Sequence, residues 1–443
     1  MQAFLARFTT EWTPELPTPP LEGVPGMGEI DVGGRRCLTL AANDPLGLAT
    51  DARVREAASA ALRRFGTACD GATRVLFELE AALAAHLGRP AALVAADLNE
   101  LWPTLATQAD AVHLARALPE GWRASAPAHT FGHLVELEAA LPREPGEAII
   151  VGVPGVTFGR GDLANLPRVE DLARRAGAAL VVDESLGLGV LGEHGRGALE
   201  HLACAAEALV VSALGPLGGS GVVLAGPQAV IDRLRGSPMR SLPPPALLAA
   251  ALRGLELVRQ EPARRARVLD AALVLHRLLR SRGFDTGPSV THVIPVWVGD
   301  EARALRLRSA LLESGLAVGC VLAPGRSRLV LMPQATQTDA QLEQAVELLE
   351  RLARRAGMAF SPPPSSVEIA LARPKSFAQS APCGAHWEEP MTQPQEPTSL
   401  VKELVSSAAR GLPGRVFAAV ETLTWRAVNS TSGDVRSWLR RRR

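Results

Sequence analysis

The sequence predicts an α/β protein with a large, doubly wound domain, a small α+β domain and a C-terminal tail. Short apolar runs alternate with helical stretches up to about residue 260, as in a mostly parallel sheet buried on both faces. A second, shorter set of strands and helices follows between residues 291 and 355. Beyond residue 358 the composition becomes proline-rich and polar, which is typical of a linker.

The first predicted helix covers residues 51–65. Thr50 is its expected N-cap, Gly66 its expected stop, and Ala58, Leu62 and Phe65 lie on one apolar face. Another helix is expected over residues 168–176. Five short apolar runs each predict a strand of the large sheet, at residues 91–95, 148–153, 178–183, 208–212 and 221–225.

Two longer helices, over residues 245–260 and 262–282, separate the large sheet from the small domain. The small domain is predicted to contain three strands and two helices. The strands are expected at residues 291–298, 316–322 and 328–332, and the helices at residues 301–314 and 339–355.

These elements divide the chain into five parts. They are an N-terminal arm (1–35), the large domain (36–260), the small C-terminal domain (261–357), a disordered linker (358–398) and a basic amphipathic tail (399–443). Residues 401–443 carry nine basic and three acidic side chains. The tail is interpreted either as a solvated helix or as a segment that docks on an anionic membrane surface or a partner.

Composition excludes several classes of protein. The 443 residues are 47% hydrophobic and 21% charged, which suits a globular protein with a sizeable core. A net charge of +1 gives no general attraction to nucleic acid. Five widely spaced cysteines form no C-x-x-C pair, which argues against a disulfide framework or a zinc site. Without an N-terminal apolar leader or a long apolar run, the expected location is the cytoplasm, with the membrane surface as the alternative for the tail.

Three sequence blocks resemble one enzyme family. Residues 43–48 (N-D-P-L-G-L) resemble the motif N-D-Y-L-G-L, residues 181–192 resemble V-D-E-A-H-G-T-G-V-L-G, and residues 193–197 match its continuation. In this order and spacing they are similar to the α-oxoamine synthases from about residue 36 to residue 356. This family includes 8-amino-7-oxononanoate synthase, 2-amino-3-ketobutyrate CoA ligase and serine palmitoyltransferase.

The resemblance implies a pyridoxal-phosphate (PLP) transferase of fold type I, within the class I/II aminotransferase fold. It also implies PLP as cofactor, condensation of an amino acid with an acyl-CoA, and a dimer with its active sites at the interface. Around Asp183 the run D-E-S-L, followed by G-V-L-G-E-H-G-R-G, most resembles the non-catalytic subunit of heterodimeric serine palmitoyltransferase.

Two positions retain residues that suit PLP. Asp183, at a predicted strand end, matches the family aspartate that pairs with the pyridine nitrogen of PLP. The alternative for Asp183 is a loop-ordering or helix-capping role. Ser212 replaces the family threonine, and its hydroxyl is either a phosphate contact or an ordinary strand-end group. The glycine turn at residues 218–221 serves either close approach to a ligand or folding alone.

Other family positions have lost their chemistry. Gly215 stands where the family has the lysine that holds PLP as a Schiff base, and the only lysines of the chain are Lys375 and Lys402. Pro119 and Leu186 stand at the two histidine positions.

The groups that bind substrate and phosphate are altered too. Val330 replaces the arginine expected to bind the substrate carboxylate. In residues 95–100 the phosphate-binding loop has become A-A-D-L-N-E, which places two carboxylates where a dianion would bind.

The combined losses predict a non-catalytic subunit, a homodimer or a heterodimer with a lysine-bearing paralogue. Covalent PLP is excluded by Gly215, and the cofactor is either held non-covalently or not bound. The alternatives are an active PLP-dependent acyltransferase with non-covalent cofactor and a membrane or scaffold adaptor. A dinucleotide site at the G-x-G-x-x-G of residues 187–192 and a zinc site at His129 and His133 are both rejected from their sequence context.

Overall fold

The computed structural model describes residues 21–360 except Met27 and residues 68–70, 125–127, 143–145, 205–206 and 237–240. By internal contacts the chain divides into Pro20–Glu388 and a second unit of Met1–Pro19 with Glu389–Arg443. All described residues belong to the first unit. The predicted tail and nearly all of the predicted linker lie outside them. Within the described part, no helix is long and apolar enough to cross a membrane.

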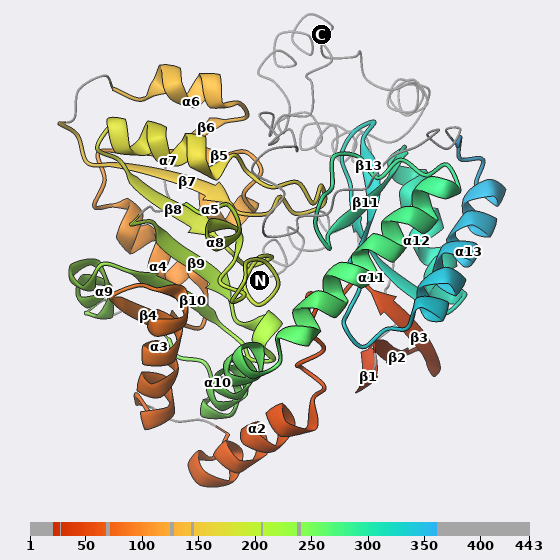
Figure 1. The fold of residues 1–443 in the computed structure, drawn as a ribbon, viewed down its shortest axis with the longest axis horizontal. Coiled ribbons are helices and arrows are strands. Elements are labelled where there is room, and N and C mark those ends of the chain that lie inside the picture. Colours follow the sequence, from red (N-terminus) through yellow and green to blue (C-terminus); the bar gives the residue numbers. More distant parts are fainter. Residues whose placement is uncertain are drawn as a thin grey trace, which may run out of the picture. The chain divides into compact units, whose positions relative to one another are not determined.

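A seven-stranded mixed sheet forms the larger part of the fold (Figure 1). Its order is β4-β10-β9-β8-β7-β5-β6. The strands are β4 (Ala91–Ala95), β5 (Ala111–Ala115), β6 (His129–Phe131), β7 (Ile149–Pro154), β8 (Ala179–Asp183), β9 (Leu209–Ala213) and β10 (Val222–Gly226). The five predicted strands are confirmed to within about a residue.

The strand directions refine the prediction. β6, β5, β7, β8 and β9 are parallel, whereas β10 runs antiparallel to both β9 and β4. The sequence missed β5 and β6. His113 interrupts the apolar run of β5, and β6 has only three residues, so neither gives a clear apolar signal.

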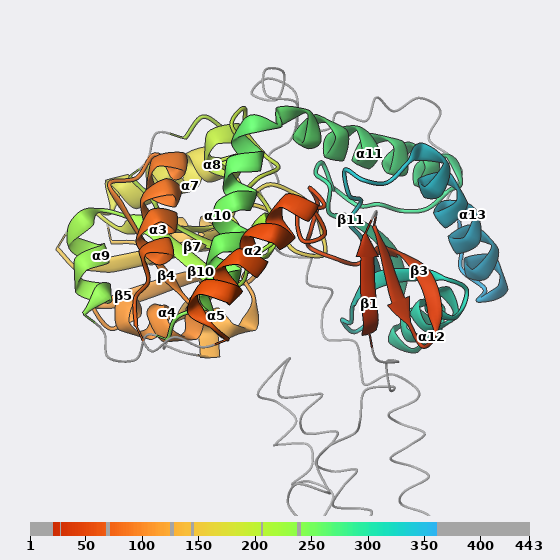
Figure 2. The ribbon, with the colours of Figure 1, turned by 90° about the horizontal axis from the view of Figure 1, so that it is seen from below.

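Helices cover both faces of this sheet, as Figure 2 shows. α3 (Arg74–Leu87), α7 (Leu166–Arg175) and α10 (Pro245–Gln260) share one buried cluster with alternate strand residues such as Val94. α4 (Leu98–Ala106), α5 (Glu120–Ala124) and α9 (Gln228–Arg235) share another with the intervening residues, such as Leu93. Because successive strand side chains point to opposite faces, the two clusters are the two faces of a doubly wound sheet.

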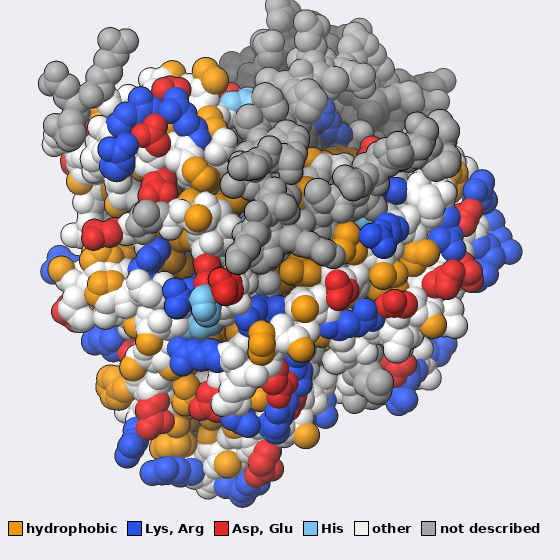
Figure 3. All heavy atoms as spheres, in the orientation of Figure 1, with side chains coloured by type: hydrophobic (Ala, Val, Ile, Leu, Met, Phe, Trp, Pro, Cys, Tyr) orange, Lys and Arg blue, Asp and Glu red, His pale blue; other side chains and the backbone are white. Residues whose placement is uncertain are grey.

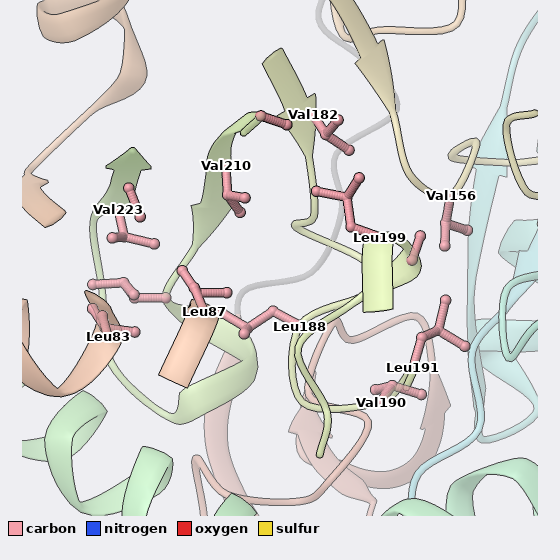
Figure 4. Packing of buried hydrophobic residues seen from close by; sticks show 14 of the residues in the cluster. Leu83, Leu87, Val156, Val182, Leu188, Val190, Leu191, Leu199, Val210 and Val223 are labelled. Atoms are coloured by element: carbon pink, nitrogen blue, oxygen red, sulfur yellow. The ribbon is translucent and has the colours of Figure 1, made fainter. Parts of the chain in front are cut away.

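The glycine-rich segment after β8 is part of the core. Leu188, Val190 and Leu191 are each about 1% exposed, and Figure 4 shows them among the labelled residues of the buried cluster. The next helix, α8 (Ala198–His201), has only four residues and begins beyond the motif. The G-x-G-x-x-G of residues 187–192 therefore packs against the sheet and does not open a dinucleotide-binding helix.

Helix α2 (Ala52–Phe65) corrects one prediction. Its N-cap is Asp51, whose side chain accepts a hydrogen bond from the Arg53 amide, while Gly66 ends the helix as expected. Leu62, on the predicted apolar face, is 44% exposed, and the buried residues are Val54 and Ala61. The helix packs mainly on α10, and this contact, which the local pattern does not contain, sets the buried face.

A six-stranded sheet of order β1-β2-β3-β12-β13-β11 forms the second part of the fold. Its strands are β1 (Leu21–Gly26), β2 (Glu29–Val32), β3 (Arg35–Leu40), β11 (Ile294–Gly299), β12 (Leu316–Val321) and β13 (Ser327–Leu331). Helices α11 (Pro262–Ser281), α12 (Glu301–Glu313) and α13 (Asp339–Arg355) pack on this part.

The pairing of β3 differs from the predicted domain division. β3 pairs in parallel with β12, so residues 36–40, assigned to the large domain, belong to the small sheet. The contact joins segments far apart in the sequence, which explains why local patterns did not reveal it. The other domain boundaries stay predictions.

Candidate functional site

The candidate site lies at the carboxyl ends of β8 and β9. These strands are parallel neighbours in which Asp183 aligns with Val211, so the segment from Ser212 to Gly215 begins beside Asp183. The carboxyl edge of parallel strands is where α/β folds place their ligands. The structure thus places Asp183 and Ser212 on neighbouring strands, with Gly215 just beyond the end of β9.

Asp183 is held by groups of the chain itself. Its Oδ1 accepts a hydrogen bond from the Ser185 amide at 2.9 Å. Burial raises the pKa of Asp183, and hydrogen bonds from Ser185 and from the Trp122 side chain oppose this rise. Asp183 keeps some exposed surface as a residue, but its carboxyl group lies deep enough for desolvation to dominate.

Ser185 connects the two strand ends. Its Oγ accepts the Ala213 amide at 3.0 Å, and its hydroxyl also hydrogen-bonds Asp183. The Ser185 carbonyl accepts the side-chain amide of Asn43 at 3.1 Å, so the N-D-P-L-G-L block reaches the same place. Ser185 stands at the alanine of the family motif, and its hydroxyl adds a polar group there.

Trp122 approaches Asp183 from α5. It is 2% exposed, and its ring lies 4.8 Å from that of Trp102, centroid to centroid. The Trp102 Nε1 donates to the Trp122 carbonyl at 2.7 Å. Both tryptophans belong to the buried cluster on the α4 and α5 face of the sheet.

Gly215 opens a short 3-10 turn, η1 (Gly215–Leu217), after β9. It is exposed, and a Cβ placed there would meet no atom within 4 Å. The position therefore has room for a side chain, and the glycine is not required by packing.

The glycine turn that follows has a folding role. A Cβ at Gly219 would lie 2.6 Å from the Ala251 Cβ, and one at Gly221 would lie 2.5 Å from the Ala95 carbonyl oxygen. Gly218 and Gly221 also have positive φ, at 77° and 99°. Close packing thus explains these glycines without a ligand.

Ser212 is fully buried, and its Oγ donates to the neighbouring Ala213 carbonyl at 3.1 Å. The bond is local, and it gives the hydroxyl a partner within the chain. A phosphate contact by Ser212 stays a prediction.

The start of α4 is capped by acidic side chains. Asp97 is the N-cap, and its Oδ1 accepts the Asn99 amide at 2.7 Å. Glu100 accepts hydrogen bonds from both the amide and the hydroxyl of Ser241. Because these carboxylates bring negative charge to the positive end of the helix, a phosphate dianion would be repelled there.

The remaining predicted positions carry apolar side chains. Pro119 is exposed at the start of α5, and Leu186 is half-buried against the large core. Val330 is fully buried in β13, between Gly319 of β12 and Pro295 of β11. None of the three side chains can donate a hydrogen bond or carry a charge.

Sequence comparison places this fold in a family. The family model for aminotransferase class I and II matches residues 111–349. An 8-amino-7-oxononanoate synthase of Symbiobacterium thermophilum is 32% identical over 360 residues, which cover 74% of this chain and 91% of that protein. One of Anaeromyxobacter dehalogenans is 36% identical over 349 residues, 72% of this chain and 87% of that protein.

The chain belongs to the α-oxoamine synthase family.

Solved structures show the same fold. Serine palmitoyltransferase of Sphingomonas wittichii superposes with a TM-score of 0.72 at 24% identity, over 80% of this chain and 96% of that one. An 8-amino-7-oxononanoate synthase of Francisella tularensis gives a TM-score of 0.62 at 20% identity, over 73% and 99%. The PLP fold type I is confirmed, whereas the local likeness to a non-catalytic subunit stays a prediction.

The residues of this α-oxoamine synthase relative can be tested against the cofactor of its family. PLP needs an amine for its aldehyde, and the described residues contain no lysine. PLP also needs hydrogen-bond donors for its phosphate. In the first turn of α4, the Asn99 amide already donates its hydrogen bond to the Asp97 carboxylate. At the ring end, Asp183 Oδ1 already accepts the Ser185 amide at 2.9 Å. The residues present do not fit a covalently held PLP.

Metal chemistry has no support in the described part of the chain, where no group of three or more metal-binding side chains gathers. His129 lies beside His113 on the neighbouring strand, with ring centroids 5.4 Å apart.

Trp122 and Ser185 are the site residues that the sequence analysis missed. Ser185 could have been found, because it departs from alanine in a matched motif. Trp122 gave no comparable signal. It lies one helical turn beyond Pro119, but only the fold shows that α5 brings its indole to the end of β8.

Proposed function

We propose that this protein is a non-catalytic member of the α-oxoamine synthase family, a subunit that supports a lysine-bearing paralogue in the condensation of an amino acid with an acyl-CoA. The observation that carries the proposal is Gly215. It lies just after β9, whose Val211 pairs with Asp183, and no described residue offers a primary amine in its place. Without that amine the chain can neither hold the cofactor as an imine nor return a proton to it.

The preserved scaffold supports a role in assembly. Glu184 is fully buried and accepts the Ala198 and Leu199 amides at 2.7 and 2.9 Å, which fixes the loop after β8. The chain has thus kept the architecture around the site while the reacting groups have changed. A dimer surface depends on that architecture and can outlast the chemistry.

Two exposed apolar side chains are candidate contacts for such a partner. Leu62 on α2 is 44% exposed and Phe77 on α3 is 53% exposed. Both helices pack on α10. Because an exposed apolar side chain is stabilised when a partner covers it, both side chains are chosen for the test of association.

The test uses a strain that carries both this chain and a lysine-bearing paralogue. Deleting this chain should lower the paralogue's turnover, and supplying the wild-type chain should restore it. The double variant Leu62→Glu and Phe77→Glu should fail to restore turnover or to co-purify with the paralogue. The control is Val135→Glu on α6 (Leu134–Ala140), which is 75% exposed and should behave as wild type. Unchanged turnover in the deletion strain would contradict the proposal.

An active PLP-dependent acyltransferase with non-covalent cofactor is the second candidate. The 32 to 36% identity to 8-amino-7-oxononanoate synthases and the retained Asp183 favour it. This candidate predicts that PLP added to the purified chain stays bound to it and absorbs between about 330 and 430 nm. Absence of that absorbance after dialysis would remove this candidate.

Predictions about partners and location remain open. On the face drawn in Figure 3, basic and acidic side chains are interspersed, consistent with the net charge of +1. That pattern gives no support to nucleic acid as a partner. The adaptor role of the tail concerns residues outside the described part and stays a prediction, as does the cytoplasmic location.

A further inference from the structure

The loop after β7 contacts both sheets. We call residues 155–164, which lie between β7 and α7, the β7 loop. At its start the Gly155 amide donates to the Asp183 carbonyl at 2.8 Å, so the loop leaves the seven-stranded sheet beside the candidate site. A bridge between Val156 and Leu163 closes the loop on itself. The β7 loop is therefore a compact turn at the carboxyl edge of that sheet.

Buried contacts keep the β7 loop compact. Val156 and Leu163 are buried in the main cluster of the seven-stranded sheet, where Figure 4 labels Val156. Asp162 is buried too, and its carboxylate lies 3.2 Å from the Arg160 guanidinium. The Thr157 amide donates to the Asp162 carbonyl at 3.0 Å. A segment with buried side chains and internal hydrogen bonds opens rarely.

Arg328 of β13 makes the first contact from the six-stranded sheet. Its Nε donates to the Gly159 carbonyl at 2.6 Å. Its guanidinium also lies over the ring of Trp297 in β11, 4.8 Å from the centroid. Arg328 is buried, and a charged donor bonded away from water makes a strong hydrogen bond. Arg328 thus fixes the middle of the β7 loop to β13 and β11.

The segment before β11 makes the second contact. The Gly161 carbonyl accepts the Val290 amide at 3.1 Å and the Thr291 hydroxyl at 3.0 Å. Gly161 has a φ of 70°, and a Cβ there would lie 1.8 Å from the Val293 carbonyl oxygen. Only glycine permits such a close approach of two backbones. The β7 loop and this segment therefore fit each other closely over consecutive residues.

We propose that the β7 loop is a conformational connection between the sheets: Arg328 and Thr291 hold it from the six-stranded sheet, and its opening is coupled to that of the Asp183 edge. The two contacts come from different elements and meet one loop at Gly159 and Gly161. A displacement of β13 or of the segment before β11 is then transmitted to the strand end that carries Asp183. This inference goes beyond the proposed function, because it concerns the isolated chain and needs neither a partner nor a cofactor.

The first experiment is hydrogen exchange of the full wild-type chain, read by mass spectrometry of its peptides. Peptides from residues 155–164 and from residues 289–293 should exchange at rates within about tenfold of each other, because coupled segments open together. Urea below the unfolding transition should lower their protection in parallel. A β7 loop that exchanges at least about 100-fold faster than residues 289–293 would overturn the proposal without any variant.

The second experiment removes the Arg328 contact. Arg328→Met keeps a long apolar stem and loses the guanidinium, so residues 155–164 should exchange at least about tenfold faster than in wild type. Ser327→Ala is the matched control on β13, because it removes a buried hydroxyl that bonds the Ala323 backbone. In this control the β7 loop should exchange at the wild-type rate. The β4 peptide, from the far edge of the seven-stranded sheet, reports global opening and should not change in either variant.

A third variant keeps the test decisive if Arg328→Met does not fold. Thr291→Val preserves the shape of the side chain and removes the hydroxyl, so the β7 loop should exchange at least about threefold faster. Thr286→Val is its control, since it removes a buried hydroxyl that accepts the Arg280 Nε at 2.8 Å. Wild-type exchange of the β7 loop in Thr291→Val, or equal acceleration of the loop and β4, would overturn the proposal. The proposed function is tested by the turnover of a partner, so the two can fail separately.

Discussion

Replacing His292 by leucine should remove part of the protein's sensitivity to acid. His292 is fully buried, and neither ring nitrogen has a hydrogen-bond partner among the described residues. Burial lowers its pKa from 6.5 to about 4. Because the unfolded chain takes up a proton below pH 6.5 and the folded chain does not until about pH 4, the stability that depends on His292 is lost as the pH falls through this window.

The size of the effect follows from this shift. At pH 5 the solution is about 1.5 pH units below the unfolded-state pKa of 6.5 and still above the folded-state pKa of about 4. At about 1.36 kcal/mol per pH unit, protonation of His292 then stabilises the unfolded chain relative to the folded chain by about 2 kcal/mol. His292→Leu removes that loss. At pH 8 the variant should be about as stable as wild type, because removing two unsatisfied nitrogens offsets imperfect packing of the new side chain.

The assay is urea unfolding at pH 8 and pH 5, followed by tryptophan fluorescence. The free energy of unfolding of wild type should fall by about 2 kcal/mol more than that of His292→Leu between the two pH values. Val293→Ile perturbs the same buried segment without a titratable group, so its effect should be independent of pH. Parallel changes in wild type and His292→Leu would refute the reasoning.

Three further predictions concern charges and packing near the sheet. Arg235→Met leaves the buried Glu80 carboxylate without its 2.7 Å ion pair and should destabilise the protein by about 3 kcal/mol in urea unfolding. Arg63→Met, which breaks an exposed pair, should change stability by less than about 1 kcal/mol. Gly197→Ala would place a Cβ 2.3 Å from the Glu184 carboxylate at a φ of 112° and should lower the melting temperature or abolish soluble expression. Burial raises the pKa of Glu184 from 4.5 to about 7, so the contribution of Glu184 to stability falls as the pH rises through this range. Glu184→Gln cannot ionise, and the melting temperature of this variant should therefore not show that fall.

The strands and helices that have a strong local pattern could be predicted from the sequence. α10 and α13 begin and end as predicted, because proline at the start of one and a Thr338–Gln341 capping box at the start of the other mark them clearly. β6 was missed because three residues carry no period. The pairing of β3 with β12 was missed because it joins residues nearly 280 positions apart, which no local pattern encodes.

The candidate site shows the same division. Asp183 and Gly215 could be located because they lie in ordered motifs that match a family, and the fold places them at neighbouring strand ends. Trp122 could not be located, because its role depends on how α5 packs beneath the sheet. Sequence reasoning thus predicted which groups the site has lost, whereas the structure revealed the Ser185 amide that holds Asp183.

The most direct test of the account is release of CoA by the purified chain. With PLP, small amino acids and short- or long-chain acyl-CoA, a thiol reagent should detect no CoA beyond that released by the same mixture without protein. Sustained release by this chain alone, at a rate proportional to its concentration, would contradict the claim that it has no catalytic amine and acts as a supporting subunit.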